Sequence, residues 1–270
     1  PERGDGMLDF GFEKAESVDA AVAALKADGD AKILAGGQSL VPVLKMEFAE
    51  PSMLISLRGI DALKEIKEDG NKIIIGAMAT HASVEHSDVV KKSMPSLAHL
   101  ASGIGDAQVR NRGTIGGSIA HADPAADYPA AIVGYKCQVK TDSRIIDGDQ
   151  FFTELFETAL NPGEVVTAVH CEKPEKAAYL KFANPASKYA IVGVCVAKYS
   201  DGVRVGVTGA KSVAFRWTAL EQALSANFDS GAAASAELDT SDFMTDLDAD
   251  AEYRKHLIRV MAKRAIEGAR

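Results

Sequence analysis

Apolar side chains in the first third of the chain recur first at helical and then at extended spacing. Residues 17–26 carry them on one helical face behind Ser17, a candidate N-cap, and Gly29 follows as a stop. The apolar runs after Gly29 are short, and they predict strands at 31–34, 53–57 and 72–78 and a short helix at 40–46. This order of helices and strands predicts mixed α/β layers.

The middle of the chain continues this alternation. Residues 80–102 predict two or three short helices, broken near Pro95. The next apolar stretches predict strands at 131–139, 144–147 and 164–170 and a helix at 149–155.

Extended runs dominate beyond residue 178. They predict strands at 179–182, 191–199 and 203–208. Asp201-Gly202, between the last two, favours a hairpin turn. Helices are predicted at 216–224 and 251–269, the second with one apolar stripe. The change to an antiparallel sheet predicts a domain boundary near residues 172–177.

Composition narrows the class of protein. The 270 residues are 47% hydrophobic and 25% charged, as in ordinary globular proteins, and they suffice for one large domain or two smaller ones. The formal charge of -8 argues against a nucleic-acid partner. No apolar run approaches the ~18 residues that a membrane span needs, and residues 1–6 lack a secretory signal pattern.

The cysteines and histidines predict no metal site. Cys137, Cys171 and Cys195 are far apart in apolar surroundings, which predicts reduced thiols in a cytoplasmic protein. Without a Cys-x-x-Cys motif, an iron–sulfur cluster or zinc site in this chain is not expected. His81 and His86 are five residues apart and would not share a helix face, so we expect surface or capping roles for them.

An acidic stretch precedes the last helix. Residues 221–252 contain nine acids, and residues 225–253 contain no lysine or arginine. The stretch is interpreted either as a solvated connection or as an acidic surface that docks a partner.

Two glycine pairs, Gly36-Gly37 and Gly116-Gly117, are the main candidates for chemistry. Without Cβ atoms each pair can take positive φ and direct backbone N–H groups into one concavity. Neither matches Gly-x-Gly-x-x-Gly or a P-loop, which argues against an NAD enzyme or an ATPase. The N–H groups of two such loops could still neutralise a diphosphate without lysine. Ser39, Thr114 and Ser118 would add hydroxyl donors.

Asp127, ten residues after Gly117, follows a turn opened by Asp123-Pro124. An ionised carboxylate only accepts hydrogen bonds, so Asp127 would suit ribose or ribityl hydroxyls rather than phosphate.

The sequences around both glycine pairs match one known family. Residues 34–40, Leu-Ala-Gly-Gly-Gln-Ser-Leu, and residues 108–118, Gln-Val-Arg-Asn-Arg-Gly-Thr-Ile-Gly-Gly-Ser, resemble the FAD-binding (medium) subunit of the molybdenum hydroxylases. This family includes aerobic carbon monoxide dehydrogenase and xanthine dehydrogenase. Residues 181–190 and the Tyr253-Arg254-x-x-Leu257 pattern of the final helix extend the resemblance over nearly the whole chain.

The resemblance implies an α+β (mixed α/β) protein with the FAD-binding fold of vanillyl-alcohol oxidase. Residues 1–174 would form the FAD-binding domain, with subdomains at about 1–57 and 58–174. Residues 175–270 would form a C-terminal domain of antiparallel sheet and helices.

The resemblance also assigns cofactor contacts by position. Those in the two loops are Leu34, Ala35, Gly36, Gly37, Gln38, Ser39, Leu40, Val41, Thr114, Ile115, Gly116, Gly117 and Ser118. Elsewhere, Ile104 and Val166 would supply apolar contacts and Asp127 would lie near the sugar-like chain of the flavin. Lys181 would lie near the isoalloxazine, where a cation stabilises reduced flavin, and Tyr189 would pack close to the ring.

Some positions depart from the family or leave alternatives open. Gln38 stands where histidine or asparagine is common, so no covalent histidyl link is expected there, and Ser118 is often asparagine. Lys181 could instead be a solvated strand residue, and Tyr189 plain core. Arg110 and Arg112 could pair with local acids or face a partner protein.

The implied function is electron transfer. FAD on this chain would take electrons from [2Fe-2S] clusters on an iron–sulfur small subunit and pass them to an external acceptor. A large subunit with a molybdenum-pterin cofactor would oxidise the substrate, in a cytoplasmic dimer of heterotrimers. The alternatives are a self-sufficient FAD-dependent oxidoreductase of the same fold and a non-redox interaction subunit.

Overall fold

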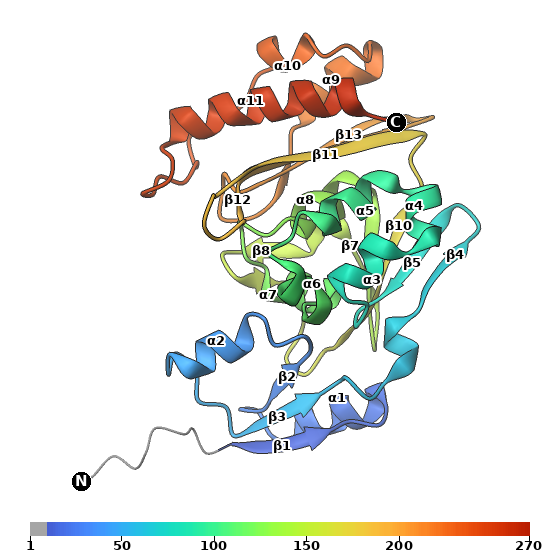
Figure 1. The fold of residues 1–270 in the computed structure, drawn as a ribbon, viewed down its shortest axis with the longest axis vertical. Helices are drawn as coiled ribbons and strands as arrows, with labels where there is room; N and C mark the ends of the chain where they lie inside the picture. The colour runs from blue at the N-terminus through green and yellow to red at the C-terminus, as the bar shows by residue number, and fades with distance from the viewer. Residues whose placement is uncertain (1–9) are drawn as a thin grey trace.

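The computed structural model describes residues 10–270, and Figure 1 shows its parts stacked along the longest axis. The blue N-terminal part lies at one end, the orange and red C-terminal part at the other, and the green and yellow middle part between them. Each part holds its own sheet with helices packed on it, which confirms the mixed α/β class. Residues 1–6, on which the absence of a signal was predicted, lie outside the described range.

The N-terminal part is a small parallel sheet with the strand order β1-β3-β2. Its strands are β1 (Gly11–Lys14), β2 (Lys32–Leu34) and β3 (Met53–Ser56), and its helices are α1 (Val18–Ala27) and α2 (Leu40–Lys45). Ser17 caps α1 by accepting a hydrogen bond from Ala20 N at 3.1 Å. The predicted helices and two predicted strands are confirmed here, and β1 was not predicted.

The middle part is built on a five-stranded antiparallel sheet with the order β4-β5-β10-β6-β7. These strands are β4 (Ile66–Asp69), β5 (Lys72–Gly76), β6 (Cys137–Thr141), β7 (Ile145–Asp147) and β10 (Val166–Glu172). Its helices are α3 (His81–His86), α4 (Asp88–Ser93), α5 (Pro95–Ser102), α6 (Ala107–Arg112), α7 (Ile115–His121) and α8 (Tyr128–Gly134). Short 3-10 turns at Asp61–Lys64 and Gly148–Gln150 and the pair β8 (Phe152–Glu154) and β9 (Glu157–Thr158) complete it.

The C-terminal part is a four-stranded antiparallel sheet covered by helices on its outer face (Figure 1). Its elements are β11 (Lys176–Ala183), β12 (Ala190–Tyr199), β13 (Gly202–Thr208), β14 (Phe215–Arg216), α9 (Thr218–Ala226), α10 (Ala232–Ser235) and α11 (Ala251–Gly268). Alternate residues of β12 enter different cores: Val194 and Val196 pack under the outer helices, and Cys195 and Ala197 pack toward the middle part. The predicted Asp201-Gly202 hairpin is confirmed. The chain changes sheet between β10 and β11, and the predicted boundary after residue 174 stays a prediction.

Three sequence-based assignments in the middle part are wrong. Of the strand predicted at 131–139, residues 131–134 belong to helix α8 and residues 137–139 to strand β6; the helix was missed because α8 is buried on all sides between two sheets and its continuous apolar run carries no helical period. The helix predicted at 149–155 is a 3-10 turn followed by β8, since the Asp147 carboxylate accepts from Asp149 N and closes a turn there. Gly116-Gly117 was predicted to be a turn and lies inside helix α7.

The thiol prediction is wrong for two of the three cysteines. Cys137 on β6 and Cys171 on β10 are directly opposite in the antiparallel ladder and form a disulfide, whereas Cys195 is a buried free thiol. The pairing depends on strand register, which sequence spacing does not reveal. Because two of the three cysteines are joined in a disulfide, the cysteines no longer support the predicted cytoplasmic location. Within residues 10–270 no helix has the length and apolarity to cross a membrane.

The acidic stretch is attached to the C-terminal part at several points. Glu221 is buried and accepts from Val205 N at 2.9 Å and from Arg216 Nη2 at 2.6 Å. Asp246 pairs with Arg254 at 2.5 Å. These contacts contradict a purely solvated connection, and partner docking by the remaining acids stays a prediction.

Candidate functional site

A cavity of about 580 Å³ lies where the three parts of the chain meet. Its walls come from the loop after β2, the start of α7, the loop before α6, the strand entry at β10 and the loop between β11 and β12. Most of the predicted site residues line it: Ala35, Gly36, Gly37, Gln38, Ser39, Leu40, Ile104, Thr114, Gly116, Gly117, Ser118, Asp127, Val166 and Tyr189.

The four other predicted residues lie outside its lining. Leu34 and Val41 line a second cavity of about 510 Å³, which shares residues 35–38 of the same loop with the first. Ile115 is buried in the core of the middle part, and Lys181 lies behind the cavity wall.

The first glycine pair lies in a sharp, tightly packed bend of the backbone. Gly37 has φ +75°, and a Cβ on Gly36 would lie 2.2 Å from Arg112 O and 2.7 Å from Gly113 Cα. The two glycine stretches therefore touch, and only glycine fits at position 36. Within the described chain, the N–H groups of residues 36–39 donate to no other protein atom. Four adjacent free donors on residues that line one cavity suit an anion.

The second glycine pair plays a different part from the one predicted. Gly116 N donates to Ala77 O at 2.9 Å and Gly117 N to Thr114 Oγ1 at 3.1 Å, so these N–H groups are already used. A Cβ on Gly116 would lie 2.5 Å from Ala77 Cβ, and one on Gly117 would lie 3.3 Å from Ala35 Cβ. The prediction of a second N–H cradle is wrong, because Gly116 serves close packing of α7 on Ala77 and Gly117 serves the approach of α7 to the first loop at Ala35.

Asp127 and Lys181 bind each other at the edge of the cavity. Tyr179 Oη donates to Asp127 at 2.6 Å, and Lys181 Nζ lies 2.9 Å from the same carboxylate. Burial raises the pKa of Asp127, and the Lys181 ammonium opposes that rise. Lys181 is therefore not a solvated strand residue. Tyr189 is 42% exposed and lines the cavity, so it is not plain core.

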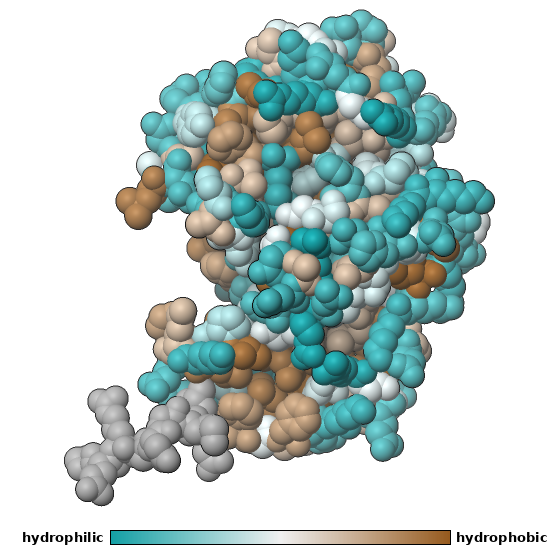
Figure 2. All heavy atoms as spheres, in the orientation of Figure 1, coloured by the Kyte–Doolittle hydropathy of each residue, from teal (hydrophilic) through white to brown (hydrophobic). Residues whose placement is uncertain are grey.

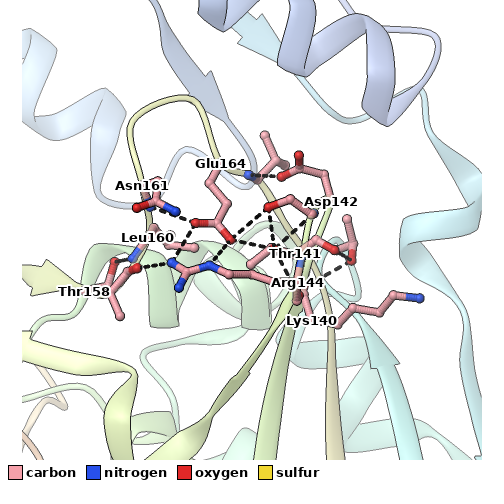
Figure 3. A network of polar contacts seen from close by, with 12 residues as sticks. Lys140, Thr141, Asp142, Arg144, Thr158, Leu160, Asn161 and Glu164 are labelled. Carbon is pink, nitrogen blue, oxygen red and sulfur yellow. Dashed lines mark hydrogen bonds and ion pairs between the residues drawn. The ribbon is translucent and has the colours of Figure 1, made fainter.

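A polar network holds the segment that leads into β10 (Figure 3). The Glu164 carboxylate accepts from Arg144 Nε and Nη2, both at 2.9 Å, from the Thr141 hydroxyl at 2.7 Å and from Asn161 N at 2.8 Å. The Arg144 hydrogen bonds, and with them those from Asn161 and Thr141, outweigh burial and lower the pKa of Glu164 to about 2. This segment carries four residues of the cavity lining: Leu160, Glu164, Val165 and Val166.

His81 is a cavity residue that the sequence prediction missed. It is 4% exposed rather than at the surface, and a Cβ on Gly113 would lie 2.5 Å from its Nε2. Burial, and secondarily the Arg110 charge, lowers the pKa of His81 to about 4, so the imidazole is neutral at pH 7. Its Nδ1 and the nearby Tyr128 hydroxyl have no hydrogen-bond partner in the described part of the chain. The bridge between Thr80 and Thr114 brings His81 to the cavity, and no local sequence signal predicts it.

Arg110 pairs with a local acid, which is one of the two roles predicted for it from the sequence. Its Nε lies 2.9 Å from Glu85, and its Nη1 donates to Ile104 O at 3.2 Å, which ties helix α3 to the loop before α6.

Known proteins are similar to this chain over almost its whole length. Residues 8–171 match the family model described as the FAD binding domain in molybdopterin dehydrogenase. The nicotine 6-hydroxylase medium subunit of Paenarthrobacter nicotinovorans is 34% identical, with 93% of each chain covered. The chain is also similar to two solved structures, with 96% of each chain covered. A carbon monoxide dehydrogenase from Hydrogenophaga pseudoflava that lacks the Mo-pyranopterin moiety gives a TM-score of 0.87 at 34% identity. Quinoline 2-oxidoreductase from Pseudomonas putida 86 gives 0.89 at 28% identity.

Proposed function

The chain belongs to the family of FAD binding domains in molybdopterin dehydrogenases, and on this premise we propose that it holds FAD non-covalently in the 580 Å³ cavity. Membership confirms the family, the cofactor and the oxidoreductase class that the two glycine loops predict. The structural similarities confirm the predicted fold.

One observation carries the placement of the cofactor. The four free N–H groups of residues 36–39 belong to consecutive residues of the cavity lining, and the diphosphate is the anionic group of FAD. Gln38 offers no nucleophile for a covalent link. The apolar walls at Ile104 and Val166 suit a flat aromatic ring.

The chain's own residues bind and orient the cofactor. FAD, when bound, supplies the redox chemistry, and the protein supplies position and electrostatics. Residues 36–39 would hold the diphosphate, Gly117 lets α7 approach that loop at Ala35, and Tyr189 lines the cavity from the loop between β11 and β12.

We further propose that the chain is the electron-transfer subunit of a larger cytoplasmic complex. Electrons would arrive from [2Fe-2S] clusters on an iron–sulfur small subunit and leave to an external acceptor. A molybdopterin large subunit would oxidise the substrate, in a dimer of heterotrimers. The name "medium subunit" of the nicotine 6-hydroxylase relative supports partner chains.

The surface of the N-terminal part also supports a partner. Figure 2 shows apolar side chains gathered over this part, where Phe12, Met46 and Phe48 are between 63% and 77% exposed. Large exposed apolar groups that lie close together mark interaction surfaces.

The cofactor site is tested by Gly36→Ala, with Gly29→Ala as the matched control. A Cβ on Gly36 would overlap Arg112 O, whereas one on Gly29 meets no atom within 4 Å. We expect Gly36→Ala to weaken FAD binding at least tenfold, measured by flavin fluorescence in a titration, and Gly29→Ala to leave it unchanged. Full affinity in Gly36→Ala, or no FAD uptake by the unaltered chain, would refute the site.

The complex is tested by native mass spectrometry of the protein purified with its partners. We expect subunits that carry molybdenum and iron. A chain that turns over a substrate alone, without such partners, would instead support the self-sufficient flavoprotein.

A further inference from the structure

A buried polar cluster joins the start of helix α8 to strand β11. Asp127 is 4% exposed and receives the Tyr179 hydroxyl at 2.6 Å. Lys181 Nζ lies 2.9 Å from Oδ1 and 3.0 Å from Oδ2 of the same carboxylate. Tyr179 and Lys181 are two residues apart, so they leave β11 on the same face. Both oxygens of Asp127 are therefore bound by the C-terminal sheet.

The Lys181 ammonium also holds two walls of the cavity. Its Nζ donates to Gly103 O at 2.8 Å and to Lys188 O at 2.7 Å, in addition to Asp127. An ammonium group has three protons, and these three acceptors use all of them. Each backbone acceptor directly precedes a residue of the cavity lining, Ile104 or Tyr189. One largely buried ammonium group thus fixes both residues relative to each other.

The surrounding sheet is shaped to receive this cluster. A Cβ on Gly193, which is opposite Lys181 in the ladder, would lie 2.4 Å from the Tyr179 hydroxyl. Ala190 N donates to Ala125 O at 3.0 Å, and the Thr208 hydroxyl lies 2.9 Å from Ala126 O. The turn before Asp127 is therefore docked on β12 and β13 as well as on β11.

We propose that Lys181 and Asp127 are positioning residues, which set the spacing between the Ile104 and Tyr189 walls of the cofactor site. This inference rests on the proposed binding of FAD. The two side chains carry opposite charges at contact distance, so as a pair they present little net charge to a flavin. Their contribution is the geometry of the walls, in place of direct stabilisation of reduced flavin by the lysine.

The test compares oxidised and reduced FAD binding in Lys181→Met of the full chain. If Lys181 positions the walls, both oxidation states lose affinity by the same factor, at least tenfold. Selective loss of reduced-FAD affinity would overturn the proposal, because it would reveal a direct charge effect. Unchanged affinity would overturn it as well. The control is Lys198→Met, on the neighbouring strand, whose ion pair with Glu175 is exposed and 3.8 Å long, and no change is expected there.

A double variant separates positioning from the burial of an unpaired charge. Lys181→Met leaves the Asp127 carboxylate without its cation, and Lys181→Met with Asp127→Asn removes that charge too. The carbonyls of Gly103 and Lys188 still lack their donor in the double variant, so we expect no recovery of FAD affinity. Recovery to the affinity of the unaltered chain would overturn the proposal.

Trypsin cleavage after Lys188 gives a readout that does not depend on FAD. Lys181 fixes the Lys188 carbonyl, so we expect cleavage at least fivefold faster in Lys181→Met, and an unchanged rate would overturn the proposal. If the unaltered chain bound no FAD, the proposed function would fail while this measurement still tested the positioning. If Lys181→Met does not fold, Lys181→Gln keeps two amide donors and should be cleaved at an intermediate rate. Cleavage of Lys181→Gln as slow as that of the unaltered chain would refute the idea.

Discussion

Replacement of Glu164 by glutamine tests whether the network of Figure 3 holds the segment entering β10. The carboxylate side chain is 3% exposed and uses both oxygens, with the Arg144 guanidinium bound to each of them. Glutamine keeps the shape but offers one acceptor, and its NH2 group must face a donor of Arg144 or Asn161. The substitution therefore removes the charge and opposes donor to donor.

The expected loss follows from the pKa of Glu164, which the Arg144 hydrogen bonds chiefly lower from 4.5 to about 2. This difference of about 2.5 between the unfolded-state and folded-state pKa values corresponds to about 3 kcal/mol of stability. Arg144 is 42% exposed, so water screens part of the interaction and we expect about 2 kcal/mol at neutral pH. Because the folded-state pKa is depressed, this contribution is complete above pH 4.5 and is lost as pH falls toward 2.

The assay is urea unfolding of the unaltered chain, Glu164→Gln and Glu157→Gln at pH 7, 4.5 and 3. Glu157 is an exposed acid on β9, near the same segment, and its substitution should change little. Glu164→Gln should be less stable by about 2 kcal/mol at pH 7, and about half of the difference should vanish by pH 3. A difference that stays constant from pH 7 to pH 3 would show that packing, not the ionised carboxylate, is responsible. FAD affinity should fall several-fold in the same variant, since this segment carries Val165 and Val166 of the cavity lining.

Two further substitutions address the cavity wall. Gly117→Asp should abolish FAD uptake, measured by the flavin content of the purified protein. The new Cβ would lie 2.9 Å from Thr114 Oγ1 and 3.3 Å from Ala35 Cβ, and the new charge would face the diphosphate. Full flavin occupancy of this variant would contradict the prediction. His81→Gln should remove a pH dependence. The folded-state pKa of His81 is about 4, so the unfolded chain gains a proton first as pH falls below 6.5, which costs the native state up to about 3 kcal/mol by pH 4. Urea unfolding at pH 7, 5.5 and 4.5 should therefore show a smaller loss of stability in His81→Gln than in the unaltered chain, and parallel losses would refute a buried neutral imidazole.

The sequence predicted elements best where periodicity and burial agree. The helix at α1 shows an apolar face and a capping serine, and the β12–β13 hairpin has Asp-Gly at its turn, so local rules suffice there. The same rules failed to predict helix α8, because every residue from Tyr128 to Gly134 is buried. A helix that contacts protein all round has no polar face, and its run of apolar residues is indistinguishable from a buried strand.

The candidate site was predicted in its residues but not in its hydrogen bonds. The glycine loops and Asp127 carry a recognisable pattern, and most of the residues assigned from it line one cavity. Whether a backbone N–H is free depends on a distant acceptor, such as Ala77 O for Gly116 N, and no local pattern encodes that acceptor. His81 and the disulfide between Cys137 and Cys171 were missed for the same reason, since both depend on which strands and turns become neighbours.

The walls of the cavity belong to three separate hydrophobic cores, which are linked by one close backbone contact and one polar cluster. The loop after β2 extends from the N-terminal core, α7 from the middle core, and the Tyr189 loop from the C-terminal sheet. Gly36 against Gly113 joins the first two, and Lys181 with Asp127 joins the last two. Apolar burial has no direction and tolerates sliding, whereas a hydrogen bond fixes distance and angle. A site assembled from three cores therefore needs such links to hold one ligand, which explains why buried charges lie beside this cavity despite the cost of burying them.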